Sequence, residues 1–109
     1  MPACSVQINF ELACPKEQYL AHAESVLPAM REVAGLISKL WILSDDGTRA
    51  GGIYLFRDRA SAERYVNGAM VQALAGSPAI RQLDVRVTPV HVGLSVHTAG
   101  VLVEAVRES

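Results

Sequence analysis

The pattern of apolar and polar positions predicts two adjacent strands in the middle of the chain. Residues 36–44 and 52–57 are rich in leucine, isoleucine and aromatic side chains, which favour extended backbone. The Asp-Asp-Gly sequence at 45–47 lies between them and tolerates the positive φ angles of a tight turn. We therefore expect a β-hairpin over residues 36–57. Its Gly-Gly pair at 51–52 indicates a bulge or a close approach of another backbone.

Both faces of this hairpin carry apolar side chains. Leu40 and Ile42 point to one side, whereas Trp41 and Leu43 point to the other. An antiparallel sheet can leave one polar face in water, but a hairpin that is apolar on both sides needs cover on both. We expect a layer of helices on one face and a second copy of the same sheet on the other.

Alternation and helical spacing predict the other elements in chain order. Residues 4–10 alternate apolar and polar side chains, as in a strand with one apolar face. Residues 17–34 and 60–75 repeat apolar positions three and four apart, which is typical of amphipathic helices. Residues 80–91 alternate again and predict a fourth strand.

Three local signals set the expected helix boundaries. Gly35 is suited to end the first helix. Asp58 is a candidate N-cap for the second helix, since its carboxylate can accept from the first free backbone N–H groups. The Asn-Gly pair at 67–68 could divide that helix into two pieces that keep the same apolar stripe.

The predicted order is β-α-β-β-α-β followed by a tail. With right-handed crossovers this order gives an α+β fold, a ferredoxin-like antiparallel sheet with both helices on one face. Two such sheets packed face to face form a dimeric α+β barrel. We expect residues 1–109 to be a single domain of a homodimer. The tail, 92–109, is too apolar to be solvated, and we expect it to pack on the partner subunit as a strand or a short helix.

Composition narrows the class of protein. Half of the 109 residues are hydrophobic and 19% are charged, which is apolar for one small domain and favours an interface. The net charge is −1 and there is no basic block, so binding to nucleic acid or to a membrane has little support. No apolar run is long enough to span a bilayer. We expect Cys4 and Cys14 to be reduced thiols in a cytoplasmic protein, with a disulfide between them as the alternative.

Several stretches of the chain resemble the YdhR-type family of mono-oxygenases. The most specific is AGGIYLF at 50–56. The others are Gly-Leu at 35–36, Lys-Leu-Trp at 39–41, the helix of small residues that ends near 77–78, and DVRVTPVHVGLS at 84–95. Together these stretches cover most of the chain.

The resemblance implies a homodimeric α+β barrel related in fold to antibiotic-biosynthesis mono-oxygenases. Those relatives oxidise phenolic, polyketide-like rings with oxygen and without metal or flavin. It therefore implies a cofactor-independent oxidoreductase whose ligand is a small aromatic or polyketide-like molecule. This step from fold to activity is an analogy.

No motif in the sequence indicates a metal or a bound cofactor. His22, His91 and His97 are scattered over a helix, a strand end and the tail, with no carboxylate at ligand spacing. The cysteines have no histidine close by in sequence, and neither a dinucleotide-binding fingerprint nor a P-loop is present. We expect neither a metal nor a cofactor.

The implied chemistry needs an apolar cavity with aromatic walls. Trp41, Tyr54 and Tyr65 are candidates for contacts to the substrate. Each has a structural alternative: Trp41 as filler of the core or dimer interface, Tyr54 as packing within its strand, and Tyr65 as part of the helix core. The pattern does not decide whether Trp41 faces the helices or a second sheet.

The same chemistry needs a base for the substrate hydroxyl and a cation for the resulting anion. His91 or His22 could supply the base, and Arg57 could hold the oxyanion; His22 is also a candidate substrate contact. The structural alternatives are a cap-like role for His91 and a solvated helix edge for His22. Arg57 could instead pair with Asp58 or Glu63 on the surface.

Three functions therefore remain open at this stage. The first is a mono-oxygenase or oxidase of a quinol or polyketide phenol. The second is a non-catalytic protein that binds a hydrophobic small molecule in the same cavity. The third is a structural dimer whose interior is filled by side chains, and a cyclase or isomerase on this fold is not excluded.

Overall fold

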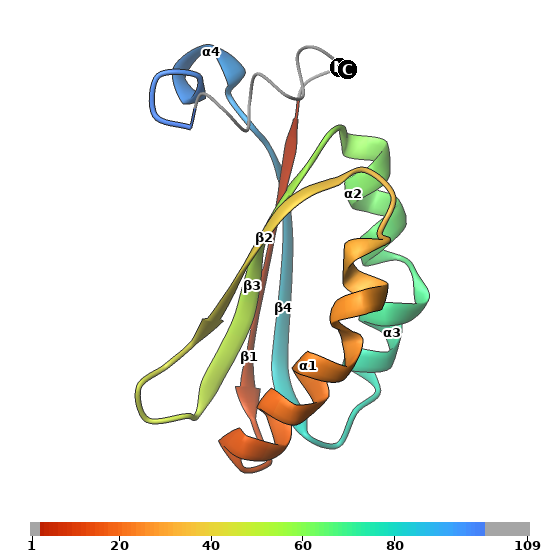
Figure 1. Cartoon of the computed structure of the whole chain (residues 1–109), viewed down its shortest axis with the longest axis vertical. Helices are drawn as coiled ribbons and strands as arrows, with labels where there is room; N and C mark the ends of the chain where they lie inside the picture. The colour runs from red at the N-terminus through yellow and green to blue at the C-terminus, as the bar shows by residue number, and fades with distance from the viewer. Residues whose placement is uncertain (1–2, 100–109) are drawn as a thin grey trace.

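The computed structural model describes residues 3–99 as an antiparallel sheet covered by helices on one face (Figure 1). The elements are β1 (Cys4–Leu12), α1 (Lys16–Arg31), β2 (Leu36–Leu43), β3 (Arg49–Phe56), α2 (Arg59–Val66), α3 (Ala69–Ala75), β4 (Ile80–Pro89) and α4 (Val92–Ser95). The predicted β-α-β-β-α-β order is confirmed, and the second helix is divided into α2 and α3 as the Asn-Gly pair indicated.

The four strands lie in the order β2-β3-β1-β4, and each neighbouring pair is antiparallel. This is the ferredoxin-like arrangement that the element order predicts. Figure 1 shows α1, α2 and α3 along one face of the sheet, whereas α4 lies beyond one end of it. Within the described residues, the fold is therefore a two-layer α+β domain whose other sheet face carries no helix.

The core lies between β1 and the helices. The alternation of β1 buries one set of its side chains against the helix layer, and these residues are Cys4, Val6, Ile8, Phe10 and Leu12. Leu83, Val85 and Val87 of β4 pack on the same core, as their alternation predicted. Cys4 and Cys14 are both free thiols.

Several expected boundaries differ from the structure, and among them β3 begins at Arg49 rather than at residue 52. The first helix ends at Arg31 rather than at residue 34, and a separate turn that contains Gly35, with a positive φ of 79°, leads into β2. The strand β1 extends to Leu12, which pairs with Ile80. The strand β4 ends at Pro89 rather than at His91, because His91 has left the sheet to become the N-cap of α4.

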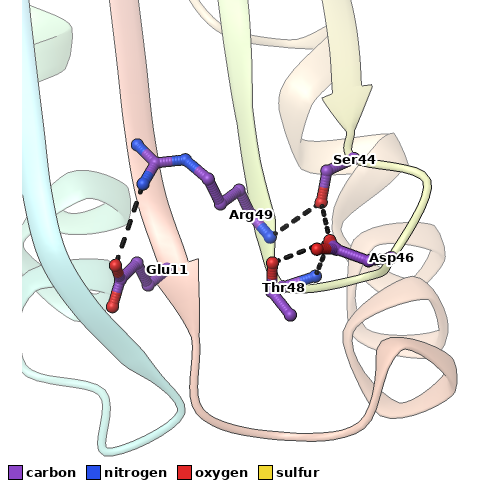
Figure 2. Close-up of polar contacts among 5 residues, drawn as sticks. All are labelled: Glu11, Ser44, Asp46, Thr48 and Arg49. Carbon is purple, nitrogen blue, oxygen red and sulfur yellow. Dashed lines mark hydrogen bonds and ion pairs between the residues drawn. The ribbon is translucent and has the colours of Figure 1, made fainter.

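The hairpin turn between β2 and β3 is held by one carboxylate (Figure 2). Asp46 Oδ1 accepts hydrogen bonds from Ser44 Oγ (2.8 Å), the Thr48 amide (3.0 Å) and Thr48 Oγ1 (2.7 Å). These hydrogen bonds lower the pKa of Asp46 to about 2, because they stabilise the ionised form. Gly47 follows with a φ of 73°, as expected for this turn, and Arg49 of β3 forms an ion pair with Glu11 of β1 at 3.7 Å.

The start of α2 is capped as predicted. Asp58 Oδ1 accepts from the Ser61 amide at 2.7 Å, which satisfies one of the free N–H groups of the first turn. Asn67 is the C-cap of α2, and Gly68, with extended backbone, is the N-cap of α3. The break lets both pieces bury residues of the same stripe, Ala62 on α2 and Val71 on α3.

The helix-free face of the sheet is apolar over the β2–β3 hairpin and polar over β1 and β4. Leu40 is 63% exposed and Ile53, its partner in the sheet register, is 41% exposed. Gln7 of β1 and Arg86 of β4 occupy the other half and are also exposed. The prediction that the hairpin is apolar on both faces is confirmed.

The predicted tail begins with the short helix α4, and residues 100–109 lie outside the described residues. Its packing on a partner subunit therefore stays a prediction. Among residues 3–99, no helix has both the length and the hydropathy to cross a membrane.

Candidate functional site

A cavity of about 320 Å³ lies between the helices and the β2–β3 side of the sheet. We call it the aromatic cavity. Its lining residues are Phe10 of β1; Tyr19, His22, Ala23, Val26 and Met30 of α1; Lys39 and Trp41 of β2; Gly51, Gly52 and Tyr54 of β3; Tyr65 of α2; and Ala69, Met70, Val71, Ala73 and Leu74 of α3. Trp41 is 38% exposed, so the cavity meets solvent beside its ring.

The cavity exists because small residues face each other across the two layers. Gly52 of β3 leaves the sheet side without a side chain, and a Cβ there would meet Lys39 Cε and Tyr54 Cε1, each at 2.8 Å. On the helix side, Ala23 and Ala73 present only methyl groups to the same space. Side chains of this size cannot fill the gap between a helix layer and a sheet.

Gly51 allows β1 and β3 to approach each other closely. A Cβ at this position would collide with the carbonyl oxygen of Ile8, so β1 and β3 approach closely here. The register between β1 and β3 runs without a shift through Ile8↔Gly52 and Asn9↔Gly51. The close approach is therefore confirmed and the bulge at Gly51-Gly52 is wrong.

The rings of Tyr54 and Tyr65 line one side of the aromatic cavity, and the fully buried ring of Phe56, which does not line it, packs against both. The Tyr54 and Tyr65 rings lie 5.1 Å apart, and Phe56 lies 6.1 Å from Tyr54 and 5.5 Å from Tyr65. A hydrogen bond of 3.1 Å joins the hydroxyls of Tyr54 and Tyr65, and Met30 Sδ lies 3.9 Å from Tyr65 Oη. Burial raises the pKa of both tyrosines, so both hydroxyls are neutral donors at physiological pH.

Lys39 brings the one side-chain amine into the cavity. Its Nζ lies 3.3 Å from the centroid of the Trp41 ring and 4.6 Å from that of Tyr54. Desolvation by burial lowers the pKa of Lys39 to about 8, because the charged form loses hydration. Lys39 was not among the site residues predicted from the sequence. The spacing could have indicated it, since residues 39 and 41 are two apart in one strand and their side chains therefore point to the same face.

Four of the six predicted site residues line the aromatic cavity. Trp41, Tyr54 and Tyr65 lie together in its wall, and His22 reaches it from α1. The strand register also shows which face of the sheet carries Trp41. Trp41 pairs with Gly52, and its side chain lies on the helix side together with that of Lys39. The side chain of His22 is at the same time an exposed edge of α1, as its structural alternative proposed.

The other two predicted site residues lie outside the lining of the aromatic cavity. His91 caps α4, where its Nδ1 accepts from the Leu94 amide at 3.0 Å, which is the cap-like alternative. Arg57 is exposed at the end of β3. Its two suggested partners are otherwise engaged, since Asp58 caps α2 and Glu63 pairs with Arg59 at 2.9 Å.

A second hollow of about 290 Å³ adjoins the aromatic cavity. Tyr19 and His22 line both spaces, and Cys14 and Ser77 line the second one only. Burial raises the pKa of Tyr19, so this residue is also a neutral phenol between the two spaces. Among residues 3–99, no group of three or more histidine, cysteine or acidic side chains could hold a metal ion.

The strand order and the single helix layer define a class of ferredoxin-like α+β domains that includes small oxygenases. Within that class, residues 6–101 match the model of the family described as "Putative mono-oxygenase ydhR". The chain belongs to this family, as the AGGIYLF block indicated. No curated protein matches the chain significantly.

Known structures share this fold at low sequence identity. A protein of unknown function from Nitrosomonas europaea has a TM-score of 0.67 and 20% identity, over 84% of this chain and 91% of that one. The cofactor-independent oxygenase SnoaB from Streptomyces nogalater has a TM-score of 0.67 and 8% identity, over 84% and 95%. The monooxygenase from the ActVA-Orf6 gene of Streptomyces coelicolor, in complex with nanaomycin D, has a TM-score of 0.59 and 17% identity, over 83% and 88%.

Proposed function

We propose that the protein is a cofactor-independent mono-oxygenase that oxidises a phenolic, quinol or polyketide-like small molecule in the aromatic cavity. The observation that carries this proposal is the cavity itself, a space of about 320 Å³ between Trp41 and the Tyr54–Tyr65 pair. Its volume lies near the lower end of the range for ligand pockets, roughly 300–1,000 Å³. An open cavity also argues against the structural dimer with a side-chain-filled interior.

The proposed reaction uses the electrons of the substrate. Loss of a hydroxyl proton makes the ring electron-rich, and molecular oxygen accepts electrons from it and adds to a ring carbon. When that carbon carries one hydrogen, it becomes a carbonyl: the ring hydrogen and the hydroxyl proton leave with the second oxygen atom as water, and the phenol becomes a quinone. The aromatic walls would hold the ring flat and keep water from the reacting carbon.

The chain contributes walls and polar groups to this reaction. Trp41 and Tyr54 would contact the ring, and the neutral hydroxyl of Tyr65 would donate to a substrate oxygen or to Tyr54. His22 would contact the ligand at the solvent edge. We assign no role in the reaction to His91 or Arg57, because neither lines the aromatic cavity.

The proposal includes a homodimer joined through the helix-free face of the sheet. Leu40 and Ile53 are exposed there, and a second copy of the sheet would bury them. The polar half, with Gln7 and Arg86, would lie at the rim of the same interface. Dimerisation would leave the aromatic cavity accessible, since it lies on the opposite face of each sheet.

Oxygen uptake tests the function. The purified protein is incubated with a panel of hydroquinones and polycyclic phenols, aerobically and anaerobically, in an oxygen electrode. We expect protein-dependent uptake, which Trp41→Phe and Tyr54→Phe reduce roughly tenfold because they alter the cavity wall. The matched control is Leu20→Ala, an exposed residue of α1 that does not line this cavity. Binding of a phenol without oxygen uptake would support a carrier and contradict the enzyme. Unchanged kinetics in both Trp41→Phe and Tyr54→Phe would show that these two residues do not contribute to the reaction.

A further inference from the structure

Lys39 occupies a chemically unusual position in the aromatic cavity. Its side chain leaves β2 on the helix side and ends between two ring faces, at 3.3 Å from the Trp41 centroid and 4.6 Å from the Tyr54 centroid. The residue is half-buried. A ligand held against Trp41 and Tyr54 would therefore lie within reach of the amine.

No acidic group among residues 3–99 pairs with this amine. Within residues 3–99, the ion pairs join Arg49 to Glu11, Arg59 to Glu63 and Arg86 to Asp84, and none of them includes Lys39. The titratable groups that line the cavity with it are Tyr19, His22, Tyr54 and Tyr65, and no carboxylate is among them. The aromatic faces attract an ammonium more weakly than a carboxylate within the cavity would.

The amine is consequently poised between its two protonation states. With a pKa of about 8, roughly one molecule in ten carries a neutral Lys39 at pH 7, compared with about one in three thousand at the ordinary value of 10.5. A neutral amine accepts a proton. Once protonated, it is an unpaired cation in an apolar space, where attraction to an anion is stronger than in water.

We propose that Lys39 ionises and holds the ligand: its amine takes the proton of an acidic hydroxyl on an aromatic ring placed against Trp41 and Tyr54, and the resulting ammonium pairs with the oxyanion. The proton moves from the ligand oxygen to Nζ, and no electrons are transferred in this step. The inference rests on the proposed function, in which oxygen then reacts with the anion. It narrows the substrate class to aromatic rings with an acidic hydroxyl.

The sequence supplies a matched control for this lysine. The chain contains two lysines, Lys39 in the cavity and Lys16 at the exposed start of α1. Lys39→Met removes the amine and keeps an unbranched apolar chain. Lys39→Arg keeps a positive charge but cannot lose a proton near neutral pH. Lys16→Met removes an equal charge from the surface.

The test measures the ionisation of a bound phenol, with oxygen excluded. The probe is 4-nitrophenol, whose anion absorbs visible light. We expect the wild type and Lys16→Met to lower the apparent pKa of the bound probe by about one unit or more, because an unpaired ammonium stabilises the anion. Lys39→Arg should retain most of this shift, whereas Lys39→Met should abolish it. Circular dichroism of each variant checks that the fold is retained.

Three results would overturn the inference. One is an equal probe pKa on the wild type and on folded Lys39→Met. Another is that His22→Gln loses the shift in the pKa of the bound probe while Lys39→Met retains it, which would make His22 the proton acceptor. The third is the absence of any spectral change when the wild type is titrated with the probe.

The oxygen electrode separates this inference from the proposed function. If the wild type ionises the probe but consumes no oxygen with any phenol, Lys39 keeps its role and the mono-oxygenase proposal fails. If oxygen is consumed at equal rates by the wild type and Lys39→Met, the mono-oxygenase stands and Lys39 loses its role. Lys39→Arg should bind the anion yet oxidise neutral phenols roughly tenfold more slowly at pH 7, since it cannot accept the proton.

Discussion

Two charged side chains of the β2–β3 hairpin show how the local environment sets ionisation at the scale of a single residue. Asp46 is exposed, yet three hydrogen bonds lower its pKa to about 2. Lys39 has no such partners within residues 3–99, and burial among rings lowers its pKa to about 8. In the first case the protein stabilises a charge, and in the second it disfavours one.

The turn carboxylate predicts a pH dependence of stability at low pH. The pKa of Asp46 is depressed on folding, from 3.8 to about 2, so its contribution is present above pH 3.8 and is lost as pH falls through about 2. We expect Asp46→Asn to be less stable than the wild type near neutral pH, with a difference that shrinks between about pH 4 and pH 2. Urea unfolding of both proteins across this range measures it. A difference that stays constant down to pH 2 would contradict the prediction.

Lys39 predicts a second rise of stability with pH, at alkaline pH. The unfolded chain binds more protons than the folded one between pH 8 and 10.5, so stability rises with pH across this window. Below pH 8, Lys39→Met should be more stable than the wild type by on the order of 2 kcal/mol, because it buries no charge. The gain should shrink as pH rises toward 10.5. Denaturant titrations at several pH values, with Lys16→Met as control, test this, and a gain that does not vary with pH would refute it.

At the scale of elements, one pair of glycines in β3 has two separate tasks. Gly51 allows β1 and β3 to approach, because a Cβ there would collide with the Ile8 carbonyl. Gly52 points to the helix side and keeps the aromatic cavity open. Adjacent residues of a strand face opposite sides of the sheet. Gly51 therefore permits the pairing of β1 with β3, and Gly52 leaves space for a ligand.

Substitution of the two glycines by alanine should therefore have different effects on stability and on ligand binding. Gly51→Ala should lower the free energy of unfolding by more than about 2 kcal/mol, since the backbone of β1 would have to shift. Gly52→Ala meets the flexible end of Lys39 and one Tyr54 ring, so it should cost less stability but weaken phenol binding severalfold. Thermal unfolding and probe titration of both variants measure the contrast. Equal loss of stability in the two would show that the distinction is mistaken.

At the scale of the whole molecule, the sheet has one apolar face under the helix layer and an apolar half, over the β2–β3 hairpin, on its other face. The helices cover the Trp41 side incompletely and leave the aromatic cavity. Nothing in the described part of the chain, residues 3–99, covers Leu40 and Ile53 on the other side. The two surfaces have different proposed partners, a small ligand on one and a second copy of the chain on the other.

The dimer proposal predicts an assembly that surface charges can dissociate. The wild type should sediment as a dimer at micromolar concentration. The double variant Leu40→Asp with Ile53→Asp should be monomeric and remain folded, since both positions are exposed in the single chain. Leu20→Asp, at 42% exposure on α1, is the control and should stay dimeric. A monomeric wild type would refute the proposal.

The apolar pattern was sufficient to predict the elements and their order, because alternation and helical spacing are local properties of the chain. It placed the apolar face of β1, the cap at Asp58 and the break at Asn67. One boundary differed because a single residue left its strand: His91 follows β4 as the N-cap of α4. The pattern also selected four residues of the site by type, since aromatic side chains in an apolar hairpin suit a ligand wall.

The tertiary structure decided what each of those residues faces. His91 and Arg57 had suitable chemistry, but packing places one at a cap and the other at an exposed strand end. Lysine is a common residue type, and it is the burial of Lys39 in the folded cavity that lowers its pKa. The sequence by itself determined the elements, their order and the family, because these depend on side-chain periodicity and a short specific block. The shape of the cavity and the ionisation of the groups within it depend on contacts between distant segments, and only folding brings those together.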